Sequence, residues 1–90
     1  MLKTLEELIA VIRQRKVYSA EESYTKKLLN DKKLSIEKVK EEIAELIDAI
    51  EKNTNKVHEA ADVLYHLMVL LEANGIKIED VMDELKKRQK

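Results

Sequence analysis

Apolar residues recur at intervals of three and four along most of the chain, a spacing that gathers them on one face of an α-helix. The first such stretch predicts an amphipathic helix over residues 4–17. Thr4 and Glu7 are spaced as in a capping box, in which a hydroxyl and a carboxylate satisfy backbone amides at the helix start. Four residues form the predicted apolar face of this helix: Leu5, Leu8, Ile9 and Ile12.

Residues 19–30 predict a short helix or turn, because the polar residues 30–33 interrupt the apolar pattern. Ser35 is then predicted to cap a second long helix, which ends at the polar residues 53–55. The apolar positions of this helix have the spacing of a stripe that faces other helices in a bundle. The stripe consists of Ile36, Val39, Ile43, Leu46, Ile47 and Ile50.

A third long helix, over residues 56–74, is apolar nearly all round, which predicts burial. Gly75, the only glycine in the chain, suits the left-handed position that ends a helix. The last predicted helix, residues 78–88, has acids in its first turn and bases in its last, which complements the helix dipole. No linker or repeat divides the chain, so we expect one all-α domain over residues 1–90, a bundle of four main helices. Because so short a chain forms a small core, we expect a homodimer to complete it.

Composition narrows the possible function classes. The formal net charge is −1, without the basic excess typical of a nucleic-acid-binding domain. The chain has no cysteine, which excludes disulfides, thiolate metal sites and cysteine nucleophiles. The longest apolar run, residues 67–71, is far shorter than the ~20 residues that cross a bilayer, and the first 12 residues lack the pattern of a signal peptide. We therefore expect a cytoplasmic protein with neither a nucleic acid nor a membrane as partner.

Acidic residues interrupt the apolar surface of the third long helix at helical spacing. Glu59, Asp62 and His66 lie at i, i+3 and i+7, so they share one edge of the helix. Glu42 and Glu45 are spaced i, i+3 on the preceding helix, and Glu42 borders its apolar stripe. Two antiparallel helices would bring the four carboxylates together, where they need a compensating charge. An oxygen-only set of ligands predicts Mg²⁺ or Mn²⁺.

Other interpretations of these residues stay open. Paired acids on a charged helix are often only a solvated face, and His66 by itself is typical of a hydrogen-bonded core histidine. A di-iron site would need Glu-x-x-His twice, but neither His58 nor His66 has a glutamate three residues earlier.

Four segments match a known family, in order along the chain. They are Ser23-Tyr24-Thr25 followed by Leu28, Lys38-Val39-x-Glu41-Glu42-x-x-Glu45, residues 59–66 (Glu-Ala-Ala-Asp-Val-Leu-Tyr-His), and Leu85-x-x-Arg88. On these segments the chain resembles the phosphoribosyl-ATP pyrophosphatase family over essentially its whole length. The Glu-x-x-Glu and Glu-x-x-Asp pair is shared with the wider MazG-like superfamily of all-α nucleotide pyrophosphohydrolases.

The resemblance implies Mg²⁺-dependent hydrolysis of phosphoribosyl-ATP to phosphoribosyl-AMP and pyrophosphate, the second step of histidine biosynthesis. It also implies a metal site made of Glu42, Glu45, Glu59 and Asp62. The candidate catalytic residues are Glu41, Glu45 and Asp62, with Glu41 preferred as the base for the attacking water. The candidate substrate-binding residues are Lys38, Arg15, Ser23, Tyr24, Thr25 and His66.

Two further hypotheses stay open, one of another enzyme and one of a protein without catalytic activity. A general MazG-like enzyme would release pyrophosphate from ordinary nucleoside triphosphates as readily as from phosphoribosyl-ATP. A non-catalytic helical dimerisation module would not respond to Mg²⁺. For residues 23–25 taken alone, a helix cap with one packed tyrosine is the simpler interpretation.

Overall fold

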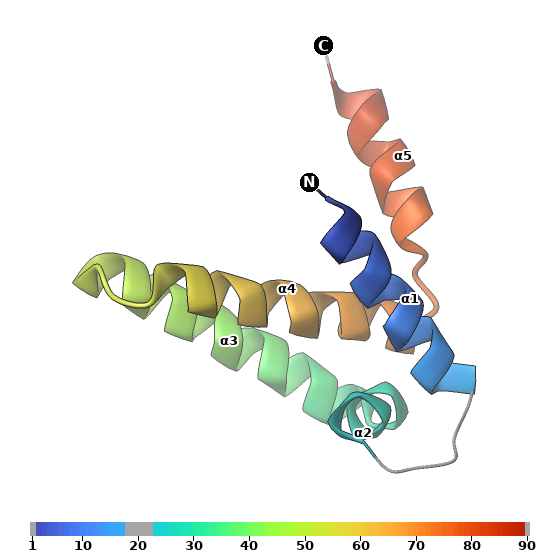
Figure 1. The fold of residues 1–90 in the computed structure, drawn as a ribbon, viewed down its shortest axis with the longest axis horizontal. Helices are drawn as coiled ribbons and strands as arrows, with labels where there is room; N and C mark the ends of the chain where they lie inside the picture. The colour runs from blue at the N-terminus through green and yellow to red at the C-terminus, as the bar shows by residue number, and fades with distance from the viewer. Residues whose placement is uncertain (1, 18–22, 90) are drawn as a thin grey trace.

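The computed structural model describes residues 2–17 and 23–89, and within these ranges it contains five helices and no strand (Figure 1). The helices are α1 (Lys3–Val17), α2 (Tyr24–Asn30), α3 (Lys32–Lys52), α4 (Lys56–Ala73) and α5 (Ile78–Arg88). The predicted all-α class is confirmed. The segment that allowed either a helix or a turn forms α2, and residues 19–22 of that segment lie outside the described residues.

Two predicted helix starts are wrong. α1 begins at Lys3, so Thr4 lies inside the first turn and does not precede the helix. α3 begins just after Asp31, whose side chain accepts a hydrogen bond of 3.0 Å from the Leu34 amide. Ser35, the predicted cap, is instead 1% exposed inside the helix. Asp31 and Ser35 both have side chains that cap helices well, and the chain uses the earlier one.

α3 and α4 form an antiparallel hairpin in which the two helices lie side by side (Figure 1). The turn between them places Asn53 and Asn55 in the left-handed region, with φ of 56° and 45°. Asparagine adopts this region more readily than most residues. The Thr54 amide donates a 2.9 Å hydrogen bond to the Ala49 carbonyl, which closes the end of α3. The predicted end of this helix at residues 53–55 is confirmed.

The apolar core lies where α1 and α2 pack against one end of the hairpin. Its buried side chains are Ile12, Leu28, Leu29, Met68 and Val69, contributed by α1, α2 and α4. Leu5, Leu8 and Ile9 pack against this cluster, as the predicted apolar face of the first helix requires. The end of the hairpin near its turn extends beyond α1 and α2 (Figure 1).

The apolar stripe predicted for α3 is only partly covered. Val39 is buried, but four side chains of the stripe are 42–56% exposed. These four are called the isoleucine face below: Ile36, Ile43, Ile47 and Ile50. On α4, Val57 is 85% exposed, although the pattern predicted burial nearly all round. Both predictions are wrong within one chain, because these side chains lie on helix faces that the packing of α3 against α4 leaves uncovered.

α5 stands apart from the other four helices. Gly75 has a φ of 69°, which confirms the predicted left-handed end of the preceding helix. α5 then runs away from the hairpin, on the side where α1 lies (Figure 1). Arg13 of α1 anchors its start through hydrogen bonds to Glu72 (2.8 Å) and to both carboxylate oxygens of Glu79 (2.6 and 2.9 Å). Among the described helices, none has the length and apolarity needed to cross a membrane.

Candidate active site

Acidic side chains are buried in the interface between α3 and α4. Glu42 of α3 is 7% exposed, and the side chain of Glu59 of α4 is 18% exposed. Asp62, one turn after Glu59, is 38% exposed at its side chain, and Glu45, one turn after Glu42, is exposed. A carboxylate as buried as that of Glu42 is costly to keep ionised without a cation or an opposite charge nearby.

Glu45 links the acids of the two helices. Its carboxyl lies within hydrogen-bonding reach of both Glu42 and Glu59, and Asp62 adds negative charge near both. The four carboxylates that the sequence assigned to a metal site therefore lie near one another, in two groups: Glu42 and Glu45 on α3, beside Glu41, and Glu59 and Asp62 on α4, beside His58. Burial raises the pKa of Glu42, and the adjacent Glu45 carboxyl raises it further. The pKa of Glu59 is raised by burial and then by Glu45 in the same way.

Two carboxylate oxygens in this cluster have no partner. Oε2 of Glu42 and Oε2 of Glu59 are buried and make no hydrogen bond within the part of the chain that the structure describes. A buried acceptor without a partner is costly, and native proteins contain few of them. A hard divalent cation such as Mg²⁺ or Mn²⁺ takes carboxylate oxygens as its ligands. The donor set therefore fits such an ion.

Lys38 supplies positive charge beside the acids. Its Nζ is 3.3 Å from Oε2 of Glu41 and 4.0 Å from Oε1 of Glu42. The hydrogen bond to Glu41 raises the pKa of Lys38, which keeps the ammonium charged. Glu41 also borders an open hollow of about 450 Å³ together with Glu45 and Glu59. This hollow gives solvent access to the acids from the side of the hairpin turn.

A set of side-chain hydrogen bonds joins α2 to α4 at the other end of the cluster. Oη of Tyr24 lies 2.8 Å from Nε2 of His66, and Nδ1 of His66 lies 2.8 Å from the carbonyl oxygen of Asp62. Because a carbonyl only accepts, Nδ1 carries the proton, and in the neutral imidazole Nε2 then accepts from the Tyr24 hydroxyl. The hydroxyls of Thr25 and Tyr65 lie 2.5 Å apart. The histidine is thus hydrogen-bonded and buried, as one of the open interpretations proposed.

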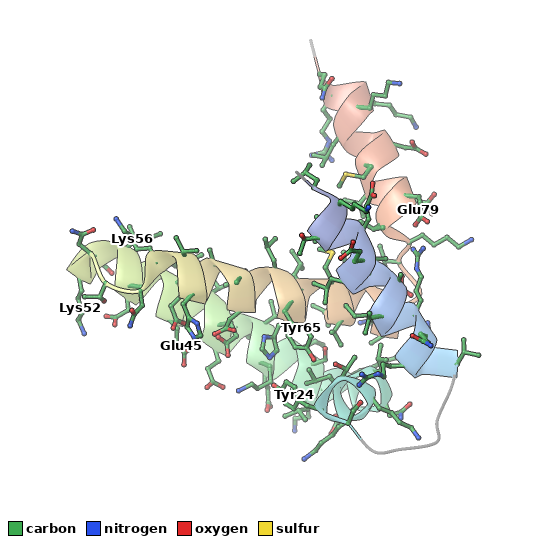
Figure 2. The ribbon with its side chains drawn as sticks, in the orientation of Figure 1. Tyr24, Glu45, Lys52, Lys56, Tyr65 and Glu79 are labelled. Atoms are coloured by element: carbon green, nitrogen blue, oxygen red, sulfur yellow. The ribbon has the colours of Figure 1, made fainter. Side chains whose placement is uncertain are left out.

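The Ser-Tyr-Thr segment borders an open pocket. Ser23 caps α2, since its Oγ accepts a hydrogen bond of 3.1 Å from the Lys26 amide. Tyr24 is 48% exposed and lies close enough to Lys38 and Glu42 to interact with their charges. It lines a pocket of about 700 Å³, whose other lining residues among those described are Ser23, Lys26, Lys27 and Asn30. Figure 2 shows Tyr24, Tyr65 and Glu45 in succession from α2 along the hairpin.

One predicted site residue does not join the others. Arg15 is exposed in the last turn of α1, and no hydrogen bond or ion pair connects it to the acids within the described residues. Arg13, two residues earlier, makes the ion pairs that anchor α5 instead.

Comparison with known proteins identifies the family. The family model for phosphoribosyl-ATP pyrophosphohydrolase matches residues 5–89. The chain belongs to this family. A phosphoribosyl-ATP pyrophosphatase from Methanocella arvoryzae is 42% identical over 100% of both chains. One from Methylobacterium nodulans is 46% identical over 94% of this chain and 82% of its own length.

Some relatives in the phosphoribosyl-ATP pyrophosphohydrolase family are longer. The histidine biosynthesis bifunctional protein HisIE of Pyrococcus furiosus is 43% identical over 99% of this chain. The chain spans 43% of that protein and 34% of another bifunctional relative. The match therefore covers one part of these two-function proteins and the greater part of the single-function ones.

Three residues of this chain lie beside the pocket or the acids, although the sequence pattern did not identify them as site residues. Lys26 and Lys27 line the pocket beside Tyr24, and they follow the Ser-Tyr-Thr segment directly. His58 has its Nε2 3.4 Å from Oδ2 of Asp62. Its i, i+4 spacing from Asp62 is the signal that could have found it.

Proposed function

We propose that the chain is a Mg²⁺-dependent phosphoribosyl-ATP pyrophosphatase, which hydrolyses phosphoribosyl-ATP to phosphoribosyl-AMP and pyrophosphate in histidine biosynthesis. The observation that carries the proposal is the pair of unpartnered oxygens on Glu42 and Glu59, in a chain of this family. A polyphosphate and buried carboxylates repel each other, so the two can meet only across a cation. Single-function relatives named phosphoribosyl-ATP pyrophosphatase align with this chain along the greater part of their length, which supports the assignment.

Glu42, Glu45, Glu59 and Asp62 would hold the ion, either Mg²⁺ or Mn²⁺. When bound, the ion neutralises phosphate charge and stabilises the leaving pyrophosphate. Glu42 and Glu59 lie on facing helices, and the Glu45 carboxyl interacts with both. The raised pKa values of Glu42 and Glu59 support the assignment, because burial and the neighbouring Glu45 carboxyl raise them and a bound cation would offset both effects.

Glu41 is the proposed base for the attacking water. Its side chain is 54% exposed and borders the same hollow as Glu45 and Glu59, so water can reach it. The water oxygen attacks the α-phosphorus, the bond from that phosphorus to the bridging oxygen breaks, and a water proton passes to the Glu41 carboxylate. Glu45 and Asp62, the other catalytic candidates, contribute as ligands of the ion.

Basic side chains bind the remaining phosphates. Lys38 lies beside the acids, and Lys26 and Lys27 line the same pocket as Tyr24. Ser23, Tyr24 and Thr25 contribute to substrate binding mainly by fixing α2, because their hydroxyls already bond within the protein. His66 does the same from α4. Arg15 stays a predicted phosphate ligand, and no hydrogen bond or ion pair joins it to these residues within the described part of the chain.

A homodimer completes the active unit in this proposal. A compact chain of this mass exposes about 5,400 Å², whereas this chain exposes 7012 Å². An excess of about 1,600 Å² per chain is what an obligate dimer interface would cover. The isoleucine face supplies apolar surface for it. At ~100° per residue, Glu45 lies on nearly the opposite side of α3, so pairing through these isoleucines would leave the acids accessible.

Pyrophosphate release from a panel of nucleotides tests the function. The chain should turn over phosphoribosyl-ATP in preference to ATP and the deoxynucleoside triphosphates, and chelation of Mg²⁺ should stop turnover. Equal turnover of the deoxynucleotides would instead favour a general MazG-like enzyme. If no nucleotide is turned over in a cation-dependent way, the result would favour the non-catalytic dimerisation module. The single domain over residues 1–90 and the cytoplasmic location stay predictions.

A further inference from the structure

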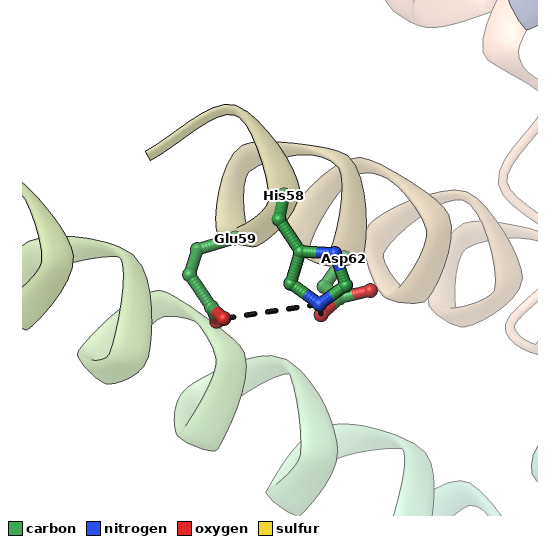
Figure 3. A group of neighbouring side chains, drawn as sticks. All are labelled: His58, Glu59 and Asp62. Atoms are coloured by element: carbon green, nitrogen blue, oxygen red, sulfur yellow. Dashed lines mark ion pairs between the residues drawn. The ribbon is translucent and has the colours of Figure 1, made fainter. Parts of the chain in front are cut away.

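The first two turns of α4 place an imidazole beside two of the proposed cation ligands. Nε2 of His58 is 3.4 Å from Oδ2 of Asp62 and 4.0 Å from Oε1 of Glu59. One ligand atom from each of the three residues lies within 4.8 Å of the others. Figure 3 shows the three side chains gathered beside one another on α4, with the ribbon of α3 close by.

The shortest of these separations, 3.4 Å between His58 and Asp62, suits two ligands of one ion. Metal bonds of about 2.1 Å hold neighbouring ligand atoms about 3.0–3.4 Å apart. The side chain of His58 is 71% exposed, so its ring can turn toward the carboxylates without a shift of the backbone. His58 and Asp62 are also four residues apart on one helix, a spacing at which two side chains can bind the same ion.

A simple ion pair does not account for the whole arrangement. Pairing of His58 with Asp62 satisfies one carboxylate, but it leaves the buried Oε2 atoms of Glu42 and Glu59 without partners. Glu42 is 7% exposed and lies close enough to Asp62 for the two charges to interact. A cation bound among these carboxylates would give the buried oxygens a partner, and the imidazole of His58 lies beside two of the carboxylates.

We propose that His58 is a nitrogen ligand at this site and gives it a preference for first-row transition ions over Mg²⁺. The inference rests on the proposed function, since both place a cation among the same carboxylates. Imidazole nitrogen binds ions such as Co²⁺ and Zn²⁺ well, whereas Mg²⁺ takes oxygen ligands. The carboxylates accept either class of ion, so His58 is the side chain that discriminates between them.

Calorimetry of the purified chain with Co²⁺ and with Mg²⁺ tests this role. His58→Gln should weaken Co²⁺ binding by about tenfold or more and leave Mg²⁺ binding within about twofold. Lys56→Gln, a change at an exposed residue in the first turn of α4, is the matched control and should alter neither. In the Co²⁺-bound wild type, proton NMR should show a strongly shifted imidazole N–H resonance that His58→Gln removes. The chain has only two histidines, so this loss assigns the ligand.

The two proposals can fail separately. Equal Co²⁺ affinity in wild type and His58→Gln, without a shifted resonance, would overturn the role of His58 while leaving a carboxylate site for Mg²⁺. Absence of calorimetric binding of both ions to every variant would overturn the cation site itself, and with it the proposed function.

Discussion

Tyr24 donates a 2.8 Å hydrogen bond to Nε2 of His66, and this bond joins the short helix α2 to α4 one turn after Asp62. The opposite ring nitrogen donates to the Asp62 carbonyl, which fixes the tautomer of the imidazole. The two rings also meet edge to face, with centroids 5.7 Å apart. The pair therefore holds the pocket beside α2 in a defined position relative to the acids.

Tyr24→Phe should keep the ring packing and lose the hydrogen bond. We expect the free energy of unfolding to fall by about 1 kcal/mol, the typical net value of one such bond. Urea unfolding measures the loss, and nitrogen NMR of His66 should show that Nε2 no longer accepts a hydrogen bond. An unchanged Nε2 signal would show that the bond does not form in solution.

The spacing of apolar residues predicted helix packing correctly where both helices in contact belong to the same chain. Leu5, Leu8 and Ile9 pack on the core as their spacing required. The isoleucine face has equally regular spacing, yet it is exposed in the single chain. A sequence pattern identifies an apolar face but does not say whether its partner is another helix of the same chain.

The acidic cluster was predictable and the hydrogen bonds of α2 were not. Glu42 and Glu59 each begin an i, i+3 pair on adjacent helices, and antiparallel packing was enough to bring the pairs together. Tyr24 and Thr25 instead bond to residues 42 and 40 positions further along the chain. Such contacts depend on how α2 packs against α4, which the pattern of residues 19–30 did not define.

Stability should depend on pH when no cation is present. The pKa values of Glu42 and Glu59 lie above the ordinary 4.5, so the folded chain holds these protons more tightly than the unfolded chain. Their contribution to stability is full below pH 4.5 and is lost as pH rises through the raised values. In a chelator, the stability of the wild type relative to Glu42→Gln should therefore fall as pH rises above 4.5.

Urea unfolding at several pH values measures this difference, with Glu51→Gln, an exposed residue of the same helix, as the control. Added Mg²⁺ at neutral pH should stabilise the wild type more than Glu42→Gln. A difference that does not vary with pH would contradict the assigned burial of Glu42.

The Arg13 ion pairs should control the mobility of α5. The bonds to Arg13 lower the pKa of Glu79 to about 2. Their contribution to stability is therefore full above pH 4.5 and is lost as pH falls through the lowered pKa of Glu79. Glu79→Gln should speed hydrogen exchange in α5 at neutral pH, whereas Glu84→Gln, which loses only an exposed 3.9 Å ion pair to Arg88 within α5, should have a much smaller effect. Equal protection of α5 in both variants would mean that the ion pairs do not hold it.

The isoleucine face should determine the oligomeric state. Ile43→Lys and Ile47→Lys place charges on apolar surface that the dimer would bury, so sedimentation should show monomers. Val17→Lys changes a residue on α1 that is 73% exposed and should leave the dimer intact. A wild-type chain that is monomeric at all concentrations would contradict the proposed interface.

The central claim is that the buried carboxylates between α3 and α4 bind the ion that makes pyrophosphate release possible. Its most direct test is turnover of phosphoribosyl-ATP at saturating Mg²⁺ by wild type, Glu42→Gln and Glu51→Gln, with the stability of each variant measured in parallel. Glu42→Gln should lose at least about a hundredfold in rate while it stays folded, and Glu51→Gln should match the wild type. A Glu42→Gln variant that keeps nearly full Mg²⁺-dependent turnover would contradict the account.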